Sequence, residues 1–224
     1  MSEEELEEQI IQQIEVLVDE LGGTMCQSTR CNSMGRQSKV IEIEYRVETK
    51  EYMNIFVTDP SPTVSAQILP DKHVVKMPLE TCQMLSIVCS EKWGHGYGKL
   101  HKKDGSAYFT EKGAFRHHPC TIWANESTIN AWWLLAHGLA LCNEYTHRYG
   151  KEHSCEKTLV EATKIMPSAE YPYKPSSFVF AGPDQFKYDK TIDIFTAYKR
   201  YIASKPWAAT NYLRDPSRKP DWLS

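Results

Sequence analysis

Two long segments with helical periodicity constrain the fold of this chain more than any other feature. Apolar residues recur at the spacing of a helix in residues 71–91 and again in residues 127–149. Gly150 follows the second segment directly, and glycine is common just beyond the last turn of a helix. Residues 155–165 and 190–204 repeat the pattern over shorter lengths. The sequence therefore predicts a mainly α protein built around a compact helical domain.

Residues 1–52 differ from the rest of the chain in charge and in pattern. They hold 12 acidic and five basic residues, whereas residues 53–224 hold 17 acidic and 21 basic ones. Residues 3–21 have the pattern of an acidic amphipathic helix, and the alternation in residues 40–48 predicts a half-buried strand. We therefore expect a small N-terminal extension, a helix plus a strand, before a helical domain at 53–224.

The extension allows two arrangements. In the first, the polar stretch at 24–39 is a loop, and the strand at 40–48 pairs with a short strand at 54–58. In the second, the acidic helix covers the more basic surface of the helical domain. The alternation at 40–48 favours the first arrangement, because it implies that one face of the strand is buried.

Composition excludes several classes of protein. No apolar run approaches the length that spans a bilayer, and the acidic start, MSEEELEEQ, is unlike a secretory or transit peptide. Seven cysteines without a C-x-x-C pair are typical of reduced thiols in a cytoplasm. Cys26 and Cys31, or the adjacent His117 and His118, lack the further ligands that a metal site needs, so we expect no metal.

A stripe of polar residues lies on the first long helical segment. His73, Lys76, Glu80 and Gln83 follow one another at intervals of three or four, which places them on one helix face. An imidazole, an amine and a carboxylate that converge on one concave surface can carry acid–base chemistry. The alternative is a solvated face with an ion pair between Lys76 and Glu80. We expect Pro78 to kink the helix or to start a new turn, which would rotate Glu80 relative to His73.

Basic residues gather in three further places. A glycine- and lysine-rich loop at 93–109 contains an Asp-Gly pair that is typical of a hairpin tip. The helix end at 143–153 and the tail at 205–224 add bases beside aromatic rings. These bases can contact phosphates and the rings can stack on bases, while salt bridges and packing of the tail on the domain are the alternatives. The candidates for phosphate contact are Lys99, Lys102, Lys103, His118, Arg148, Lys151 and Arg214.

Three blocks of the sequence resemble a known family. The blocks DKHVVKMPLE at 71–80, HPCTIW at 118–123 and LALCNEYTHRYGK at 139–151 are similar to phage and bacterial proteins associated with the pyrimidine dimer DNA glycosylases of the endonuclease V type. The similarity spans about residues 53–224. It implies a compact helical fold, DNA as the partner, no cofactor, and base removal at pyrimidine dimers with nicking of the strand. A phage-encoded member would work in the host cytoplasm.

The resemblance also implies roles for single residues. In the family, the α-amine exposed by removal of the initiator methionine attacks the deoxyribose, and a glutamate supports the sugar chemistry. By position, Glu80 takes the carboxylate role and His73 supports it. The segment MNIFVTDP at 53–60 looks like the start of such a domain, which makes Asn54 the residue that would carry the amine. A terminal amine titrates near about 7.7–8, so a useful fraction of it is neutral and nucleophilic.

The chain departs from the family because an extension precedes Met53, and Asn54 therefore carries only a peptide N–H. Three routes would supply an amine: translation from Met53, cleavage of the extension, or attack by Lys76 or Lys72 instead. The sequence leaves two other functions open. One is a phage enzyme that modifies thymine-derived bases in DNA, and the other is a nucleic-acid-binding protein without catalysis.

Overall fold

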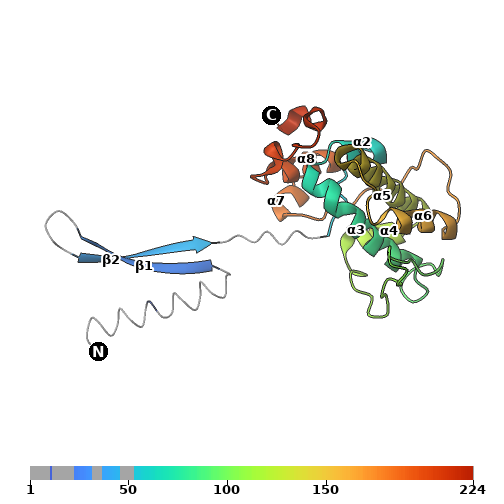
Figure 1. Cartoon of the computed structure of the whole chain (residues 1–224), viewed down its shortest axis with the longest axis horizontal. Helices are drawn as coiled ribbons and strands as arrows, with labels where there is room; N and C mark the ends of the chain where they lie inside the picture. Colours follow the sequence, from blue (N-terminus) through green and yellow to red (C-terminus); the bar gives the residue numbers. More distant parts are fainter. Residues whose placement is uncertain (1–10, 12–22, 32–36, 46–52, 224) are drawn as a thin grey trace. The chain divides into compact units, whose positions relative to one another are not determined.

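The chain divides into two compact units, Met1–Glu51 and Tyr52–Ser224, and each is described by itself (Figure 1). The structure, a computed structural model, describes residues 11, 23–31, 37–45 and 53–223. Apart from Ile11, the helix predicted at 3–21 lies outside the described residues, and so does the cover that it would form over the helical unit.

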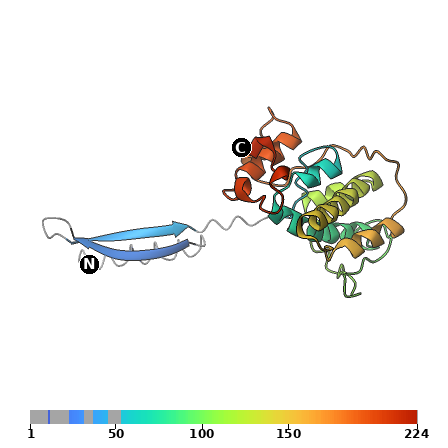
Figure 2. The same ribbon diagram turned by 45° about the horizontal axis from the view of Figure 1, so that its top comes forward.

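Two antiparallel strands form a hairpin in the N-terminal unit (Figure 2). β1 (Gly23–Cys31) pairs with β2 (Gln37–Tyr45) over the full length of both strands. Residues 40–45 of the strand predicted at 40–48 lie in β2, and residues 46–48 lie outside the described residues. The predicted loop at 24–39 is wrong for residues 24–31 and 37–39, which are strand, and the pairing with 54–58 is wrong because β2 pairs with β1. β1 is largely polar and gives little hydrophobic signal, and the short connection after it makes this pairing the local one.

The two long predicted helices form the centre of the helical unit (Figure 1). α3 (Asp71–Cys89) packs against α5 (Thr128–Tyr149), and α2 (Pro62–Gln67) packs on α5 as well. The hydroxyl of Ser127 caps the first turn of α5 by accepting a backbone hydrogen bond at 3.1 Å. Gly150 ends the helix with a φ of 66°, a left-handed conformation that favours glycine.

The close approach of α3 and α5 depends on Gly138. A Cβ atom at this position would lie 2.6 Å from Cγ2 of Thr81, so only glycine fits without a shift of the helices. α3 is one unbroken helix through Pro78, so of the two expectations for this proline the start of a new turn is wrong. Proline removes one hydrogen bond of the helix, and the burial of Val74 and Met77 around it keeps the helix continuous.

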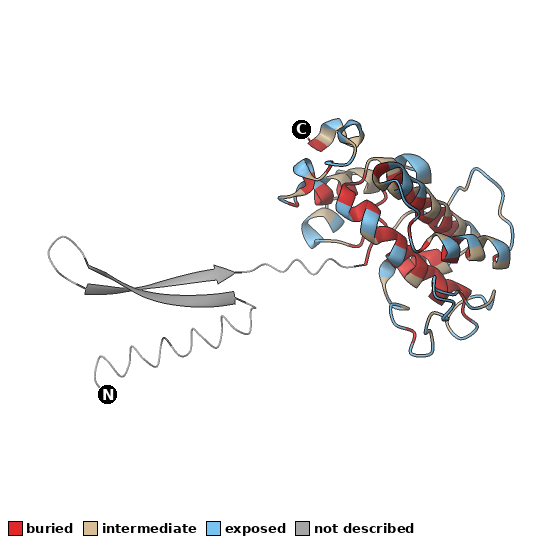
Figure 3. Ribbon diagram, viewed as in Figure 1, coloured by how far each residue is buried: buried red, intermediate tan, exposed pale blue. Residues whose placement is uncertain are grey.

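Shorter elements complete the helical unit, with α6 and α8 close to the predicted segments 155–165 and 190–204. The tail that follows α8 packs on the rest of the unit, since the hydroxyl of Tyr212 donates to the carbonyl of Ile68 at 2.7 Å. Figure 3 shows the buried residues concentrated along the inner helices. None of the helices in the described part of the chain is long and apolar enough to span a membrane. The elements are α4 (Pro119–Asn125), α6 (Glu156–Ile165), α7 (Asp184–Lys187), α8 (Ile194–Ala203) and the 3-10 turns Ala208–Thr210, Pro216–Arg218 and Asp221–Leu223.

His137 in α5 is a fully buried histidine that remains neutral in the folded protein. Its ring stacks on Trp133 at a centroid distance of 5.1 Å, and neither ring nitrogen has a hydrogen-bond partner among the described residues. Burial lowers the pKa of His137 to about 3, whereas a histidine in an unfolded chain titrates near about 6.5. As the pH falls below about 6.5, the unfolded state takes up a proton that the folded state does not, so stability is lost in acid.

Replacing His137 with phenylalanine should therefore flatten the pH dependence of stability. In the native protein, this histidine should remove about 2 kcal/mol of unfolding free energy between pH 8 and pH 5. Urea unfolding at the two pH values measures the difference, and the exposed His117→Phe variant serves as the control. Equal losses in the His137→Phe variant and the native protein would show that His137 does not carry the effect.

Candidate active site

The turn at the start of the helical unit brings the backbone of Asn54 against the carboxylate of Glu80. The backbone N–H of Asn54 donates to Oε2 of Glu80 at 2.8 Å, across 26 residues of sequence. Both residues are buried, with exposed fractions of 1% for Asn54 and 5% for Glu80. A backbone nitrogen and a carboxylate are thus held at hydrogen-bonding distance in a place that bulk water barely reaches.

Several contacts fix the position of Asn54. Its side-chain Oδ1 accepts hydrogen bonds from the backbone nitrogens of Ile55 and Phe56, at 2.9 Å and 3.3 Å. Its Nδ2 donates to the carbonyl of Ala181, far away in the sequence. Phe56 has a φ of 41°, a conformation that an L side chain rarely adopts. Such strained residues persist where the surroundings hold them, and they occur often at functional sites.

Lys76 engages the second oxygen of the same carboxylate. Its Nζ lies 3.3 Å from Oε1 of Glu80, and its side chain is 38% exposed against 7% for the glutamate. The ion pair predicted as the alternative reading of this helix face is therefore present. The face is not simply solvated, however, because Glu80 is buried beneath Lys76. The carboxylate is oriented from two sides, by a backbone N–H and by an ammonium group.

His73 lies in an aromatic cluster beside this carboxylate. Its imidazole is fully buried, stacks on Phe56 at a centroid distance of 4.1 Å and meets Trp207 edge-on at 5.4 Å. Since Phe56 follows Asn54 by two residues, His73 helps to shape the turn that presents the Asn54 nitrogen. This packing is consistent with the supporting role implied for His73, and that role stays a prediction.

The same cluster contains a lysine that the sequence did not single out. Lys205 is buried, with 7% exposure, and its Nζ lies 4.7 Å from the ring centroid of Tyr201 and 5.6 Å from that of Trp207. The ammonium also lies 6.0 Å from the ring of Phe56. Contacts of this kind stabilise a buried cation. The only sequence signal was a Lys-Pro-Trp triplet after the last helix, where charge and aromatic rings adjoin.

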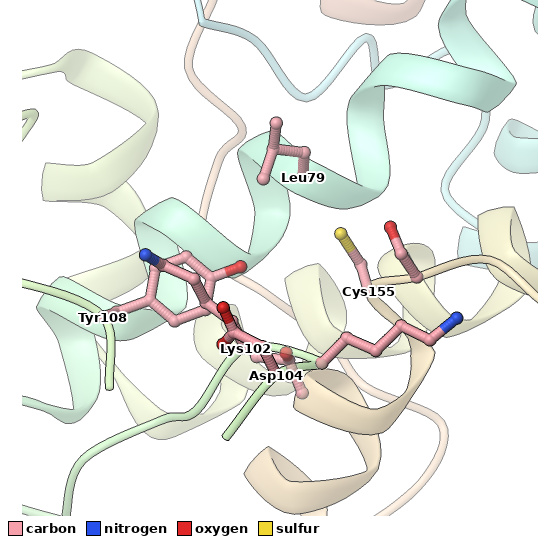
Figure 4. A pocket seen from close by; sticks show the side chains of 8 residues that line it. Leu79, Lys102, Asp104, Tyr108 and Cys155 are labelled. Carbon is pink, nitrogen blue, oxygen red and sulfur yellow. The ribbon is translucent and has the colours of Figure 1, made fainter. Parts of the chain in front are cut away.

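The basic loop and the end of α5 meet near the exposed side of α3. Lys103 and Lys151 line one pocket together with Val75 and Leu79 of α3. Lys102 and Lys103 line an adjoining pocket (Figure 4). The loop turns as predicted, with His101 bridging Ala107 and with the glycine of its Asp-Gly pair at a φ of 83°. Lys99 lines a different pocket, beside Glu91 and Glu111. Of the four exposed lysines in these two segments, the structure therefore brings Lys102, Lys103 and Lys151 together and leaves Lys99 apart.

Arg148, the fifth basic candidate in these two segments, is buried, and the phosphate contact that the sequence predicted for it is wrong. Its side chain is fully buried and forms ion pairs with Asp71 at 3.0 Å and Glu144 at 2.8 Å. The guanidinium also donates to the carbonyls of Leu69 and Gln67, at 2.9 Å and 2.7 Å. Every part of the guanidinium is engaged inside the protein, so Arg148 ties α5 to the start of α3 and is not presented to a phosphate.

The two remaining candidates lie elsewhere. His118 caps α4, because its Nδ1 accepts a hydrogen bond from the backbone nitrogen of Cys120 at 3.2 Å. Burial lowers the pKa of His118, so the ring is neutral at physiological pH and offers no charge to a phosphate. Arg214 is exposed, with its guanidinium 5.0 Å from the ring centroid of Tyr149. Its DNA contact stays a prediction.

Comparison with known proteins gives one match. Residues 53–157 match the family model described as pyrimidine dimer DNA glycosylase. The match contains Asn54, His73, Lys76 and Glu80, and it ends before Lys205. No curated protein and no solved structure matches the chain. Among the described side chains, no three His, Cys, Asp or Glu residues are arranged to hold a metal ion.

Proposed function

We propose that this chain, whose residues 53–157 match the pyrimidine dimer DNA glycosylase family, is a DNA repair glycosylase with lyase activity. Its attacking group is the α-amine of Asn54, exposed when the preceding residues are absent. One observation carries the proposal: the Asn54 nitrogen lies 2.8 Å from Oε2 of Glu80. Removal of the extension would turn that nitrogen into an amine already paired with a carboxylate, as a nucleophile and its base require.

The chemistry follows from this pair of groups. The amine attacks C1′ of the damaged nucleotide, and the bond from C1′ to the base breaks with its electron pair leaving on the base. Loss of a proton from the amine nitrogen and opening of the sugar ring give a Schiff base, from which the strand can be nicked. Glu80 stabilises the positive charge that develops at the sugar and accepts the proton. Lys76, 3.3 Å from its other oxygen, holds the carboxylate in place.

The lysine route is weaker on the same geometry. The ion pair with Glu80 stabilises Lys76 as an ammonium, which has no free electron pair for attack. The Nζ of Lys72 lies 4.6 Å from the ring centroid of Trp207, so this lysine is engaged in a cation–π contact. Both lysines are therefore better suited to holding a charge in place than to attacking the sugar.

Trapping with borohydride on UV-irradiated duplex DNA tests the proposal, because the reagent reduces a Schiff base to a stable adduct. Three chains are compared: the full chain, one beginning at Met53 and one beginning at Asn54 after site-specific cleavage of a fusion. We expect an adduct with the chain that begins at Asn54 and little or none with the other two. Equal adducts with all three would favour a lysine, and no adduct with any of them would favour a base-modifying or purely binding protein.

DNA binding should depend on the exposed bases next to α3. The logarithm of the binding constant for duplex DNA falls linearly with the logarithm of the salt concentration, and we call this slope the salt slope. The Lys103→Met and Lys151→Met variants should each have a salt slope smaller in magnitude by about 0.9, the value for one lost phosphate contact. Lys190→Met, at an exposed lysine outside both pockets, is the matched control. Fluorescence anisotropy over a range of salt concentrations gives the slopes. Unchanged slopes in both variants would move the DNA surface elsewhere.

A further inference from the structure

An amine at Asn54, once freed, has to be held beside Glu80 without the residues that now precede it. The ends of a chain are poorly ordered unless contacts tie them down, and cleavage before Asn54 makes this residue a chain end. The proposed reaction needs its nitrogen at hydrogen-bonding distance from Oε2 of Glu80, which is 2.8 Å in the intact chain. After cleavage, only the Asn54 side chain and the residues that follow can keep the nitrogen there.

The side-chain amide of Asn54 is bonded to a segment that lies far from it in the sequence. Its Nδ2 donates to the carbonyl of Ala181, 127 residues away. Both residues are buried, with exposed fractions of 1% for Asn54 and 7% for Ala181, so water does not readily replace this bond. The bond needs the length and the N–H group of the asparagine side chain, and the shorter serine would lose it.

Ala181 lies in an irregular segment, residues 179–182, which we call the anchor segment. Irregular segments are the more mobile parts of most proteins, so this carbonyl can hold Asn54 only if the anchor segment is itself fixed. Tyr198 of α8 provides that contact. Its hydroxyl donates to the carbonyl of Val179 at 2.9 Å and accepts from the backbone nitrogen of Ala181 at 3.2 Å. One hydroxyl therefore ties the anchor segment to a helix at two points.

The packing around Tyr198 links the anchor segment to the strained turn. Its fully buried ring lies against Phe180 at a centroid distance of 4.7 Å and meets Phe56, the residue with a φ of 41°, edge-on at 6.0 Å. The anchor segment has little room to shift, because a Cβ atom on Gly182 would lie 2.8 Å from Cζ of Phe180. Burial raises the pKa of Tyr198 well above its ordinary value, so the hydroxyl keeps the proton that it donates.

We propose that Tyr198 is a positioning residue that holds the Asn54 nitrogen beside Glu80 through the carbonyl of Ala181. Its effect on the reaction rests on the proposed function, whereas the contact between Asn54 and the anchor segment does not. Tyr198 lies outside residues 53–157, so the family match does not assign it a role. A small displacement of a reacting atom costs a large factor in rate, and loosening the anchor segment should therefore slow the attack on the sugar.

The first test uses the full chain without DNA and measures by NMR how fast the side-chain amide protons of Asn54 exchange with water. Tyr198→Phe keeps the ring and removes only the hydroxyl, and we expect it to make this exchange several-fold faster. Tyr212→Phe is the matched control, because it removes a buried hydroxyl that is bonded to the carbonyl of Ile68 instead. Unchanged exchange in a folded Tyr198→Phe chain would overturn the proposal.

The second test measures borohydride trapping after the folded full chain has been cleaved before Asn54. We expect Tyr198→Phe to slow trapping several-fold with unchanged affinity for DNA, and to cause no further slowing in a chain that also carries Asn54→Ser, because both changes break the same connection. Equal slowing in both backgrounds would show that Tyr198 supports only the fold and would overturn its positioning role. If no chain gives an adduct but amide exchange is faster in Tyr198→Phe, the proposed function fails and the contact between Asn54 and the anchor segment stands.

Discussion

Replacing Glu80 with glutamine should lower the rate of Schiff-base formation by about 10² to 10⁴-fold, the usual contribution of a positioned acid–base group. Glutamine keeps an oxygen that can accept the hydrogen bond from the Asn54 nitrogen, now at 2.8 Å. It removes the negative charge that stabilises the developing positive charge at the sugar and that takes the proton. Single-turnover trapping with the chain that begins at Asn54 measures the rate, and thermal unfolding checks that the fold survives.

A matched control separates this loss from a general effect of removing a carboxylate. Glu161 is a partly exposed glutamate of α6 that pairs with His101 at 2.7 Å. Glu161→Gln, made in the chain that begins at Asn54, should leave the trapping rate within a factor of about two of the unsubstituted chain. Lys76→Met should have a smaller effect than Glu80→Gln, because it removes only the group that orients the carboxylate. If Glu80→Gln traps DNA as fast as the unsubstituted chain that begins at Asn54, Glu80 has no part in the mechanism.

Replacing Arg148 with methionine should destabilise the protein by about 3–5 kcal/mol, the cost of breaking a buried ion pair from one side. The methionine would leave Asp71 and Glu144 buried without the guanidinium that now pairs with both. It would also remove the donors to the carbonyls of Leu69 and Gln67. Urea unfolding measures the change in unfolding free energy, provided that the midpoint urea concentration shifts while the dependence of the unfolding free energy on urea concentration stays the same.

An exposed arginine provides the comparison. Arg200 pairs with Asp189 at 3.3 Å and is 54% exposed, so Arg200→Met should cost no more than about 1 kcal/mol. Where the Arg148→Met variant is still folded, its salt slope for DNA binding should equal that of the native protein, since Arg148 does not face solvent. If the Arg148→Met variant has native stability and a reduced salt slope, Arg148 contacts a phosphate, as the sequence predicted.

The long helices could be predicted because their signals are local. Periodicity and a terminal glycine define α5, and the intervals among His73, Lys76 and Glu80 correctly predict the ion pair on α3. Burial on that face could not be predicted in the same way. Glu80 is covered by the turn at Asn54, and His73 is covered by Trp207, which lies more than 130 residues further along the chain. Helical spacing shows which residues share a face but not what covers the face.

The two clearest errors both concern which segments of the chain contact each other. The partners of Arg148 include Asp71, 77 residues away in sequence, and no spacing rule predicts that contact. The hairpin partner of β2 was missed because β1 is polar and shows no alternation of apolar and polar residues. The alternation in β2 indicates a strand, but it does not indicate which other segment pairs with that strand. Lys205 was missed for a similar reason, since its three aromatic neighbours come from both ends of the helical unit.

The site of covalent attachment tests the central claim most directly. Borohydride-trapped complex from UV-irradiated duplex and the chain beginning at Asn54 is digested with protease and nuclease, and the modified peptide is sequenced by mass spectrometry. We predict that the sugar remnant is attached to the α-amine of Asn54, the nitrogen that lies 2.8 Å from Oε2 of Glu80 in the folded protein. Attachment to the side chain of Lys76, Lys72 or Lys205, with an unmodified terminal amine, would contradict it.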